Sequence, residues 1–467
     1  MKPTLTLILA LALVSGCQTA RDFPRTAEAL KDVPTEGREL APEQWTTDEG
    51  STVLFMRTDE LPMLDVRLTF AAGSTRDGDQ PGLASLTSAL LDDGSQGLSV
   101  DEIARGFENL GARYSTSSHR DMGVIELRTL SRAKWREPAV DLFLDTIAAP
   151  TFPEEALERA RTRRLQTLRR HQQVPGPQVS KAYYRTLYGD HPYGHPASGT
   201  MDSIRAIERA DLQEFWETYY TSGNAVIALV GDIKQEEAQE LATRISEQLP
   251  EGGPAPELEQ AKTLSEPKRE HIDFDSQQTH LKLGNQLIHR GHPDYVPLYV
   301  GNHILGGGGF SSILMEEVRQ ERGYVYGISS GLHPMAAGGP FSVSLQTRNR
   351  QAGEALGLTL SLIEDFVADG PSQEQLRKAR DNIRGNFARS TASNSDIVGQ
   401  LAAIGFYDLP LNYLDWFREQ VNQTSVADVK QAFRKHLQPE NMAIVSIGPE
   451  KPEPKMPDEG EDDEDAE

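Results

Sequence analysis

A pattern of a helix, a turn and a β-branched strand occurs twice in this chain of 467 residues. The first copy, "ADLQEFWETYYTSGNAVIALVGD", begins at position 210, and the second, "ADVKQAFRKHLQPENMAIVSIGP", begins at position 427. A constant offset over a whole supersecondary unit indicates an internal duplication and predicts two similar domains. Three pairs of identical residues align without a gap: Asp211 with Asp428, Asn224 with Asn441, and Gly231 with Gly448.

The segments around the two copies predict the order of strands and helices. Alternating apolar residues in "STVLFMRTD" and "LDVRLTFAAGS" predict strands, and "SVDEIARGFENLGA" predicts a helix with a serine cap and a closing glycine. The fold class is therefore α+β, with two duplicated α/β domains, each an antiparallel-rich sheet with helices packed on one face. The predicted divisions are a signal peptide at 1–16, a tether at 17–43, an N-terminal domain at 44–250, a Pro-, Gly- and Glu-rich linker at 251–268, a C-terminal domain at 269–449 and an acidic disordered tail at 450–467.

The N-terminal segment, "MKPTLTLILALALVSGCQTA", has the features of a secretory signal. Lys2 precedes an apolar run that is too short to cross a bilayer as a mature helix. The run ends in "LVSGC", which resembles a bacterial lipobox, and Cys17 is the only cysteine of the chain. We therefore expect a lipid anchor on Cys17 and no disulfide within the chain. By analogy with bacterial lipoproteins, Gln18 favours the outer membrane, with the chain facing the periplasm.

The charge balance of the chain is strongly acidic. Its 70 acidic and 47 basic residues give a formal net charge of −23. The segment from Glu450 to Glu467 contributes ten acids against two lysines. Such a balance argues against a nucleic-acid partner, because phosphates need a basic surface. It is compatible with basic or neutral peptide partners, although solubility alone also explains an acidic surface.

Five further segments follow one another along the chain: "FAAGSTRDGDQPGLASL", "LYGDHPYGHPASGT", "GNAVIALVGD", "QQTHLKLG" and "ILGGGGFSSILMEEVRQERGYVYGISS". In this order, over a duplicated fold, they resemble the insulinase-like zinc peptidases, the inverzincin group. The resemblance extends over nearly the whole mature chain to about Pro449. It implies a pair of α/β domains and a function connected with peptide cleavage.

The stretch "PGLASLTSALLDDGS", which starts at position 81, matches the metal-binding segment of that family. Active members carry H-x-x-E-H there, with two histidines one helical turn apart that bind zinc and a glutamate that acts as general base. The matching positions here are Ser85, Ser88 and Ala89, and the distant third ligand falls near Gln166 or Thr167. Serine and alanine are poor zinc ligands, and neither residue at the third position is a carboxylate. The resemblance therefore implies a metal-free site and no cofactor in this chain.

The second domain keeps an arginine and a tyrosine seven positions apart, Arg319 and Tyr326, in "RQERGYVY". Family members place such a pair opposite the zinc. The resemblance implies that Arg319 positions a peptide backbone and that Tyr326 stabilises an oxyanion. Arg322 and Tyr324 are near alternatives, and a solvated arginine with a core tyrosine is the purely structural interpretation.

A glycine-rich run precedes this pair. It lacks the Lys-Ser/Thr of a phosphate loop, but glycines before a helix allow another backbone to approach closely. The non-catalytic subunit of the mitochondrial processing peptidase has a similar loop that contacts substrate, so the resemblance implies substrate binding; a flexible turn is the alternative. The run comprises Gly306, Gly307, Gly308, Gly309 and Phe310.

The remaining histidines do not form a convincing second metal site. His191 and His195 are four apart in "HPYGHP", but the prolines exclude a helix that would place them on one face, so we expect a structural turn. His280 and His303 fall in an expected strand and an expected helix of the second domain. For both, a satisfied core or cleft histidine is the preferred interpretation.

Three functions follow from these observations. The first is a lipid-anchored, zinc-less subunit that binds and positions peptide substrate for a zinc-bearing homologous partner in a heterodimeric metallopeptidase, inactive alone. The second is a non-enzymatic envelope scaffold or peptide-binding lipoprotein. The third, a self-sufficient hydrolase, ranks lowest, because the one cysteine of the chain is expected to be acylated and cannot serve as a nucleophile.

Overall fold

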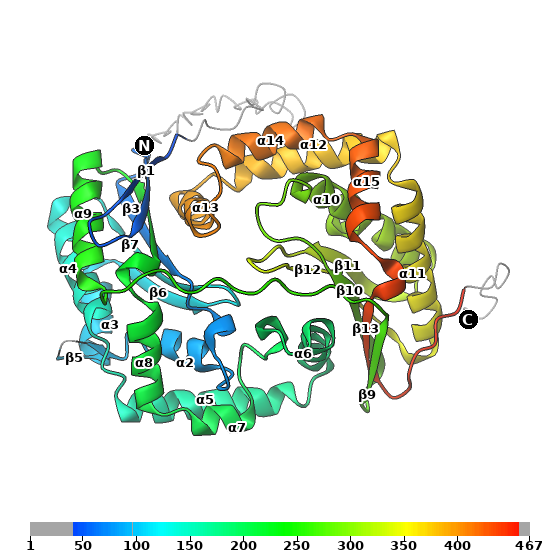
Figure 1. Ribbon diagram of the computed structural model, residues 1–467, viewed down its shortest axis with the longest axis horizontal. Coiled ribbons are helices and arrows are strands. Elements are labelled where there is room, and N and C mark those ends of the chain that lie inside the picture. The colour runs from blue at the N-terminus through cyan, green and yellow to red at the C-terminus, as the bar shows by residue number, and fades with distance from the viewer. Residues whose placement is uncertain (1–40, 96, 457–467) are drawn as a thin grey trace, which may run out of the picture. The chain divides into compact units, whose positions relative to one another are not determined.

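The computed structural model describes residues 41–95 and 97–456 (Figure 1). The predicted signal peptide, Cys17, nearly all of the tether and the end of the acidic tail lie outside the described residues. Within the described ranges, none of the helices combines the length and the apolar character needed to cross a membrane.

The first half of the chain forms a six-stranded sheet in the order β1-β2-β8-β3-β7-β6, in which only the β2–β8 pair is parallel. Its strands are β1 (Glu43–Thr46), β2 (Thr52–Arg57), β3 (Met63–Phe70), β6 (Arg113–Ser118), β7 (Gly123–Leu130) and β8 (Ala225–Gly231). A small hairpin joins β4 (Gly94–Ser95) and β5 (Leu98–Ser99). The helices are α2 (Leu83–Ala89), α3 (Val100–Leu110), α4 (Ala133–Ala148), α5 (Glu154–His171), α6 (Pro175–Tyr188), α7 (Met201–Ala206), α8 (Arg209–Tyr219) and α9 (Gln235–Gln248).

The second half forms a five-stranded sheet in the order β11-β12-β10-β13-β9, in which only the β13–β9 pair is parallel. Its strands are β9 (Lys268–Asp273), β10 (Gln278–Gln286), β11 (Val325–Leu332), β12 (Pro340–Arg348) and β13 (Ala443–Gly448). The helices are α10 (Tyr295–Asn302), α11 (Ala352–Asp369), α12 (Gln373–Arg389), α13 (Asn394–Phe406), α14 (Tyr413–Gln423) and α15 (Val426–His436). Two π-helical segments, η4 (His303–Gly307) and η6 (Met315–Glu321), lie between α10 and β11.

The aligned residues of the duplication have the same structural roles in both halves. Asp211 accepts a hydrogen bond from the backbone N–H of Glu208 at 2.8 Å at the start of α8, and Asp428 accepts one from Ser425 at 2.7 Å at the start of α15. Each aligned asparagine ends a 3₁₀ turn directly before a buried strand, β8 or β13. The predicted α+β class with two similar, antiparallel-rich halves is therefore confirmed.

The sequence predicted helices on one face of each sheet, and these helices are present. In addition, the opposite face of each sheet is covered by one helix from the other half of the chain. In β2, Val53 and Phe55 pack into the core formed by the first half's own helices. Leu54 and Met56 point to the opposite face and share a core with α13 of the second half. Both faces of this strand are thus buried, which explains why its sequence is almost continuously apolar.

The second sheet shows the reciprocal arrangement. On β13, Val445 and Ile447 pack against α6 of the first half, which contributes Val179 and Tyr183 to the same cluster. Ile444, on the other face, belongs to the core of the second half. Because each half buries a helix of the other, hydrophobic clusters extend across both halves.

Asp121 joins the two halves through buried polar contacts. Its carboxylate accepts hydrogen bonds from the hydroxyl of Tyr193 at 2.6 Å and the hydroxyl of Tyr407 at 3.1 Å. It also accepts a bond from the backbone N–H of Ala336 at 2.9 Å, and the Tyr193 hydroxyl accepts one from Ala337 at 2.9 Å. Asp121 and Tyr193 belong to the first half and the other three groups to the second, so this network fixes the halves against each other.

The predicted structural turn at "HPYGHP" is present as a 3₁₀ turn over Pro192–Gly194. His191 accepts a hydrogen bond at Nδ1 from the backbone N–H of Tyr193 at 3.1 Å. Its Nε2 lies 2.8 Å from the carbonyl of Glu259, in the segment that connects the halves. His191 therefore stabilises the turn and also contacts the segment that connects the two halves.

The first residues of the predicted tail, up to Met456, belong to the described part of the chain and contact α11. The backbone N–H of Lys455 donates to the carbonyl of Gly353 on α11 at 3.0 Å. A Cβ on Gly357 would lie only 2.0 Å from the carbonyl oxygen of Lys455, so this glycine makes room for the passing chain. Backbone contact with a helix keeps a charged segment ordered for several residues past the predicted boundary at 450.

Candidate functional site

The helix that matches the metal-binding helix of the family, α2, keeps a rigid N-terminus. Asp77 accepts hydrogen bonds from the backbone N–H groups of Gly82 at 2.7 Å and Ala84 at 2.8 Å, and its side chain is buried. Gly82 has a φ of +96°, and a Cβ there would lie 2.9 Å from the Cα of Gly199. The start of α2 therefore needs a glycine and a capping carboxylate.

Burial raises the pKa of Asp77 from its ordinary value of 3.8 to about 7, although the two N–H groups act in the opposite direction. A raised pKa means that the folded chain keeps a proton that the unfolded chain releases, so this contribution to stability is full below about pH 4 and is lost as the pH rises through about 7. Relative to Asp77→Asn, which does not titrate, wild type should lose about 1 kcal/mol of unfolding free energy per pH unit between pH 5 and 7. Urea unfolding of both proteins across this range measures the difference, and parallel pH profiles would contradict it.

The three positions that match the ligands and base all lie on α2. Ser85 is half-buried and Ala89 is exposed one turn later on the same side of α2. Ser88 is only 2% exposed, and its backbone carbonyl accepts a hydrogen bond from Thr116 at 2.7 Å. The buried hydroxyl of Tyr220 also lies near Ser88, without a hydrogen-bond partner of good geometry.

Arg164 of α5 is the residue that approaches the first of these positions. One of its terminal guanidinium nitrogens donates to the Ser85 hydroxyl at 2.6 Å, and burial lowers the pKa of Arg164. Gln166 is exposed, and Thr167 accepts a hydrogen bond from Arg170 on the surface of the helix. The structure therefore brings Arg164, and neither residue suggested by the alignment, to the centre of the degenerate site.

A signal for Arg164 was present in the sequence. On a helix, position 164 lies on the same face as Leu157 and Leu168, which are seven and four positions from it, respectively. Leu157 is buried and Leu168 packs against the core, so this face of α5 turns inward. The family resemblance instead implies a third ligand near Gln166 or Thr167.

These residues do not fit a zinc ion. The donors at the matching positions are two serine hydroxyls and no imidazole, and α5 supplies a guanidinium where a carboxylate ligand would be required. A fixed cation repels Zn²⁺, whereas a structural or catalytic zinc site is built from imidazole, thiolate and carboxylate groups. The degenerate site thus contains a permanent positive charge of the chain itself.

Another cluster of potential ligands lies in the second half, where His292, Asp294 and His436 converge. His436 Nε2 lies 2.7 Å from the Asp294 carboxylate, but the ammonium of Lys435 lies at the same distance from the same oxygen. His292 Nδ1 already accepts the backbone N–H of Asp294 at 3.0 Å. The cluster therefore links the start of α10 to the end of α15 by hydrogen bonds and an ion pair. Lys435 already neutralises Asp294, so the cluster is not suited to bind a metal cation.

Tyr326 lies on β11, the edge strand of the second sheet, at a shift in register. Val325 pairs with Thr347 and Gly327 with Gln346, so the intervening Tyr326 has no partner on β12. Such a β-bulge turns a side chain away from the regular pleat. The ring is 60% exposed, whereas Tyr324 is only partly exposed and packs against the core.

Arg319 lies on η6, one element before this strand. Its guanidinium lies 5.0 Å from the centre of the Phe310 ring, a cation–π contact, and 3.9 Å from the sulfur of Met315. Phe310 is 70% exposed, and its carbonyl accepts a hydrogen bond from Gln320 at 2.7 Å. The guanidinium of Arg319 and the ring of Phe310 thus stabilise each other's position at the surface.

The glycine-rich run forms the end of η4, with Gly306 and Gly307, and continues into a 3₁₀ turn at Gly309–Ser311. A Cβ on Gly306 would lie 2.6 Å from the Ser330 hydroxyl, and one on Gly308 would lie 2.6 Å from the His303 carbonyl. Gly309 has a φ of +67° and open space around it. The first part of the run therefore packs closely on β11 and α10, and the last part exposes Phe310.

The second-domain histidines lie in the expected elements. His280 is in β10, and His303 follows α10 at the start of η4. Burial lowers the pKa of both imidazoles. Lowered values favour the neutral form, in agreement with core or cleft histidines.

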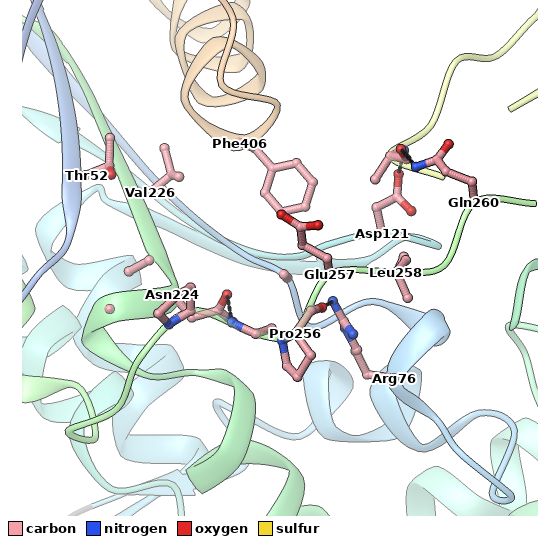
Figure 2. Close-up of a pocket in the computed structure, with 16 residues that line it drawn as sticks. Thr52, Arg76, Asp121, Asn224, Val226, Pro256, Glu257, Leu258, Gln260 and Phe406 are labelled. Carbon is pink, nitrogen blue, oxygen red and sulfur yellow. Dashed lines mark hydrogen bonds between the residues drawn. The ribbon is translucent and has the colours of Figure 1, made fainter. Parts of the chain in front are cut away.

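Figure 2 shows a cavity of about 490 Å³ where the connecting segment crosses the first sheet near the end of α13. Arg76 donates to the carbonyl of Pro256, and Asn224 accepts from the backbone N–H of Ala255 at 3.2 Å. Asp121, also in its wall, belongs to the network that joins the halves. The polar groups in the wall of this cavity bind the segment that connects the two halves. We therefore interpret the cavity as structural rather than as a ligand site.

A second pocket, of about 500 Å³, lies between α5 and α6, and we call it the α5–α6 pocket. The segment 196–201 closes one side, and Gly199 of that segment packs on Gly82 at the start of α2. The pocket therefore adjoins the degenerate site. Its wall contains four basic side chains and no carboxylate: Arg120, His171, Lys181 and Arg185.

Comparison with known proteins agrees with this geometry. The family model described as insulinase (peptidase family M16) matches residues 53–201, and the model described as peptidase M16 inactive domain matches residues 206–383. A crystal structure of a peptidase M16 inactive domain from Pseudomonas fluorescens is 44% identical, with a TM-score of 0.86, and the match covers 89% of this chain and all of that chain.

Curated relatives match over most of their length. An uncharacterized zinc protease of Mycobacterium tuberculosis is 25% identical over 430 residues, which cover 90% of this chain and 95% of the relative. The non-peptidase homolog YmxG of Helicobacter pylori is 24% identical over 411 residues, which cover 85% of this chain and 92% of the relative. The sequence resemblance, the duplicated fold and these matches together show that the chain belongs to the insulinase family, peptidase family M16.

Proposed function

We propose that this chain is the non-catalytic subunit of a two-chain peptidase of family M16, anchored in the bacterial envelope by a lipid on Cys17. It binds peptide substrate and presents Arg319 and Tyr326 to a zinc-bearing homologous subunit. Zinc belongs to the partner in this proposal and to no residue of this chain. The likeness to a peptidase M16 inactive domain and to a protein named non-peptidase homolog supports a non-catalytic role.

The observation that carries the proposal is a contrast between the two halves. In the first half, the Ser85–Arg164 hydrogen bond occupies the place where ligands would be needed. In the second half, Tyr326 stands out from a β-bulge, exposed and without a cross-strand partner. Without metal ligands, this chain has no catalytic centre of its own in which Tyr326 could act. The tyrosine would therefore act at a catalytic centre that another chain supplies.

The surroundings of Tyr326 support a role in substrate binding. Arg319 is held by the ring of Phe310, so its planar guanidinium is ordered before a peptide arrives. An arginine of this kind can donate two parallel hydrogen bonds to backbone carbonyls of a peptide. The tyrosine hydroxyl can donate to an oxyanion that develops at the carbonyl under attack.

The experiment that tests the proposal is purification of the chain from its native envelope. We expect a homologue with an intact H-x-x-E-H motif to co-purify, the complex to cleave peptides and contain about one zinc per pair, and the isolated chain to contain none. In the same cells, Cys17→Ala should release the body of the protein from the membrane pellet. An isolated chain with about one zinc and chelator-sensitive proteolysis would overturn the proposal.

The second candidate function is an envelope scaffold that binds peptides without supporting catalysis. The printed name of the Helicobacter pylori relative, non-peptidase homolog, favours it. Co-purification of a complex without any peptidase homologue and without peptide cleavage would select this function.

A further inference from the structure

Four basic side chains around the α5–α6 pocket have no acidic partner. No carboxylate of the described residues forms an ion pair with them, whereas Arg185 in the same wall pairs with Glu270. We call this set the unpaired cations: Arg120, Arg164, Lys181 and Lys282.

Two of the unpaired cations share one aromatic ring. The guanidinium of Arg120 lies 3.7 Å from the centre of the Tyr184 ring, and the ammonium of Lys282 lies 6.0 Å from it. Burial, and then the charge of Arg120, lower the pKa of Lys282. The hydrogen bonds of Arg120 go to the neutral carbonyls of Tyr193 and His195, so no negative charge balances the pair.

Of the other two unpaired cations, one lines the pocket and one lies at the neighbouring degenerate site. Lys181 is exposed on α6 and lines the wall. Arg164 lies one helical turn before Leu168, another lining residue, and donates only to the neutral hydroxyl of Ser85. Cations come from α5, α6, β10 and the loop before β7, so the charge comes from elements of both halves rather than from one basic helix.

We propose that the α5–α6 pocket binds a segment of peptide rich in aspartate and glutamate, whose carboxylates pair with Arg120 and Lys181 in its wall, while Lys282 and Arg164 add positive charge beside it. This proposal rests on the proposed function and names the class of peptide that the subunit accepts. The net charge of the chain is compatible with basic or neutral peptides, but the wall of this pocket has the opposite sign to the chain as a whole.

The size and the setting of the pocket favour a short peptide over a larger polyanion. A volume of about 500 Å³ suits a few residues of an extended peptide. A formal charge of −23 repels nucleic acids and anionic membranes at longer range, and a short segment inside the pocket meets the cations at close range. The pocket also adjoins α2, where the family pattern places the reacting part of the substrate.

The test is binding of labelled peptides to the full isolated chain, without any partner. The probes are a fluorescein-labelled dodecapeptide of alternating Glu and Ala, its Gln counterpart and its Lys counterpart. We expect the Glu peptide to bind about tenfold more tightly than the Gln peptide, and raising NaCl from 50 to 500 mM to remove most of this preference. The chain's own acidic residues after position 456 offer the same chemistry, so the probe has to bind in their presence.

Two variants and a matched control locate the binding. Lys181→Gln, at an exposed position, should weaken binding of the Glu peptide about threefold, and Lys282→Met should weaken it about tenfold. Arg159→Gln removes a positive charge from the exposed side of α5 and should leave the affinity unchanged. Thermal unfolding of each variant checks folding, and Lys181→Gln remains informative if the buried substitution does not fold.

Equal binding of the Glu and Gln peptides would overturn the proposal, as would an equal loss of affinity in Arg159→Gln and Lys181→Gln. Failure here is distinguishable from failure of the proposed function, because the assay needs neither a partner subunit nor turnover. A complex that cleaves neutral peptides with this chain present would keep the proposed function while the acidic preference is rejected.

Discussion

Tyr326→Phe should lower the turnover number of the reconstituted two-chain peptidase about a hundredfold while the complex still assembles. Removal of one donor to a developing oxyanion typically costs about 3 kcal/mol of transition-state stabilisation, which corresponds to roughly this factor. The substitution removes only a hydroxyl from a ring that is 60% exposed on a β-bulge, so the fold has little to lose. Steady-state kinetics with a saturating peptide, together with size-exclusion analysis of the complex, measure both parts of the prediction.

Arg319→Ala and Tyr324→Phe complete this experiment. The arginine should mainly raise KM, because it holds the substrate backbone in both the ground state and the transition state, although turnover can fall as well. Tyr324 packs against the core before β11 begins, and its backbone carbonyl accepts a bond from Thr347, so loss of its hydroxyl should change little. Wild-type turnover in all three variants, in a stoichiometric complex, would reject the proposed pair and favour the scaffold function.

The duplication could be predicted because its signals are local. A residue such as Asp211 caps its own helix, and Asp428 repeats the contact 217 positions later. Such bonds join residues three positions apart and are therefore visible in a short window of sequence. The same holds for Ser99 and Gly111, which cap the two ends of α3 as the pattern predicted.

The exchange of helices between the halves could not be predicted in this way. An amphipathic pattern shows which face of α13 is apolar, but it does not identify the sheet that the face covers. Continuous apolar runs such as "NAVIALVG" do indicate a strand buried on both faces, since β8 is buried along its whole length. That signal implied a second layer, and only the tertiary structure showed that the other half supplies it.

Part of the candidate site could also be predicted, because some of its signals lie within a short stretch of sequence. The absence of ligands at Ser85, Ser88 and Ala89 follows from a motif within five residues. The Ser85–Arg164 bond joins positions 79 apart, and no pattern within one helix shows that contact. Likewise, the bulge at Tyr326 arises from pairing with a separate strand, although the spacing to Arg319 had singled out this tyrosine.

Restoring the family motif with Ser85→His, Ser88→Glu and Ala89→His should not by itself give a chain that retains stoichiometric zinc. Arg164 would remain beside the first introduced ligand, since it now lies 2.6 Å from the Ser85 hydroxyl. At about 4 Å and an effective dielectric constant near 20, two unit charges interact with about 4 kcal/mol, so a divalent ion meets about 8 kcal/mol of repulsion from one guanidinium. The carboxylate introduced at position 88 would also enter a site that is 2% exposed, at a further cost in stability.

Adding Arg164→Glu to this triple variant should raise the zinc content from near zero to about one per chain. The change removes the repelling cation and supplies a carboxylate on the inner face of α5, so one substitution corrects both defects. Arg159→Glu in the same triple background is the matched control, because it makes the same charge change on the exposed side of the same helix. Elemental analysis after dialysis against a weak chelator measures the zinc. Retention of one zinc by the triple variant alone, or by the Arg159→Glu control, would show that Arg164 does not exclude the metal.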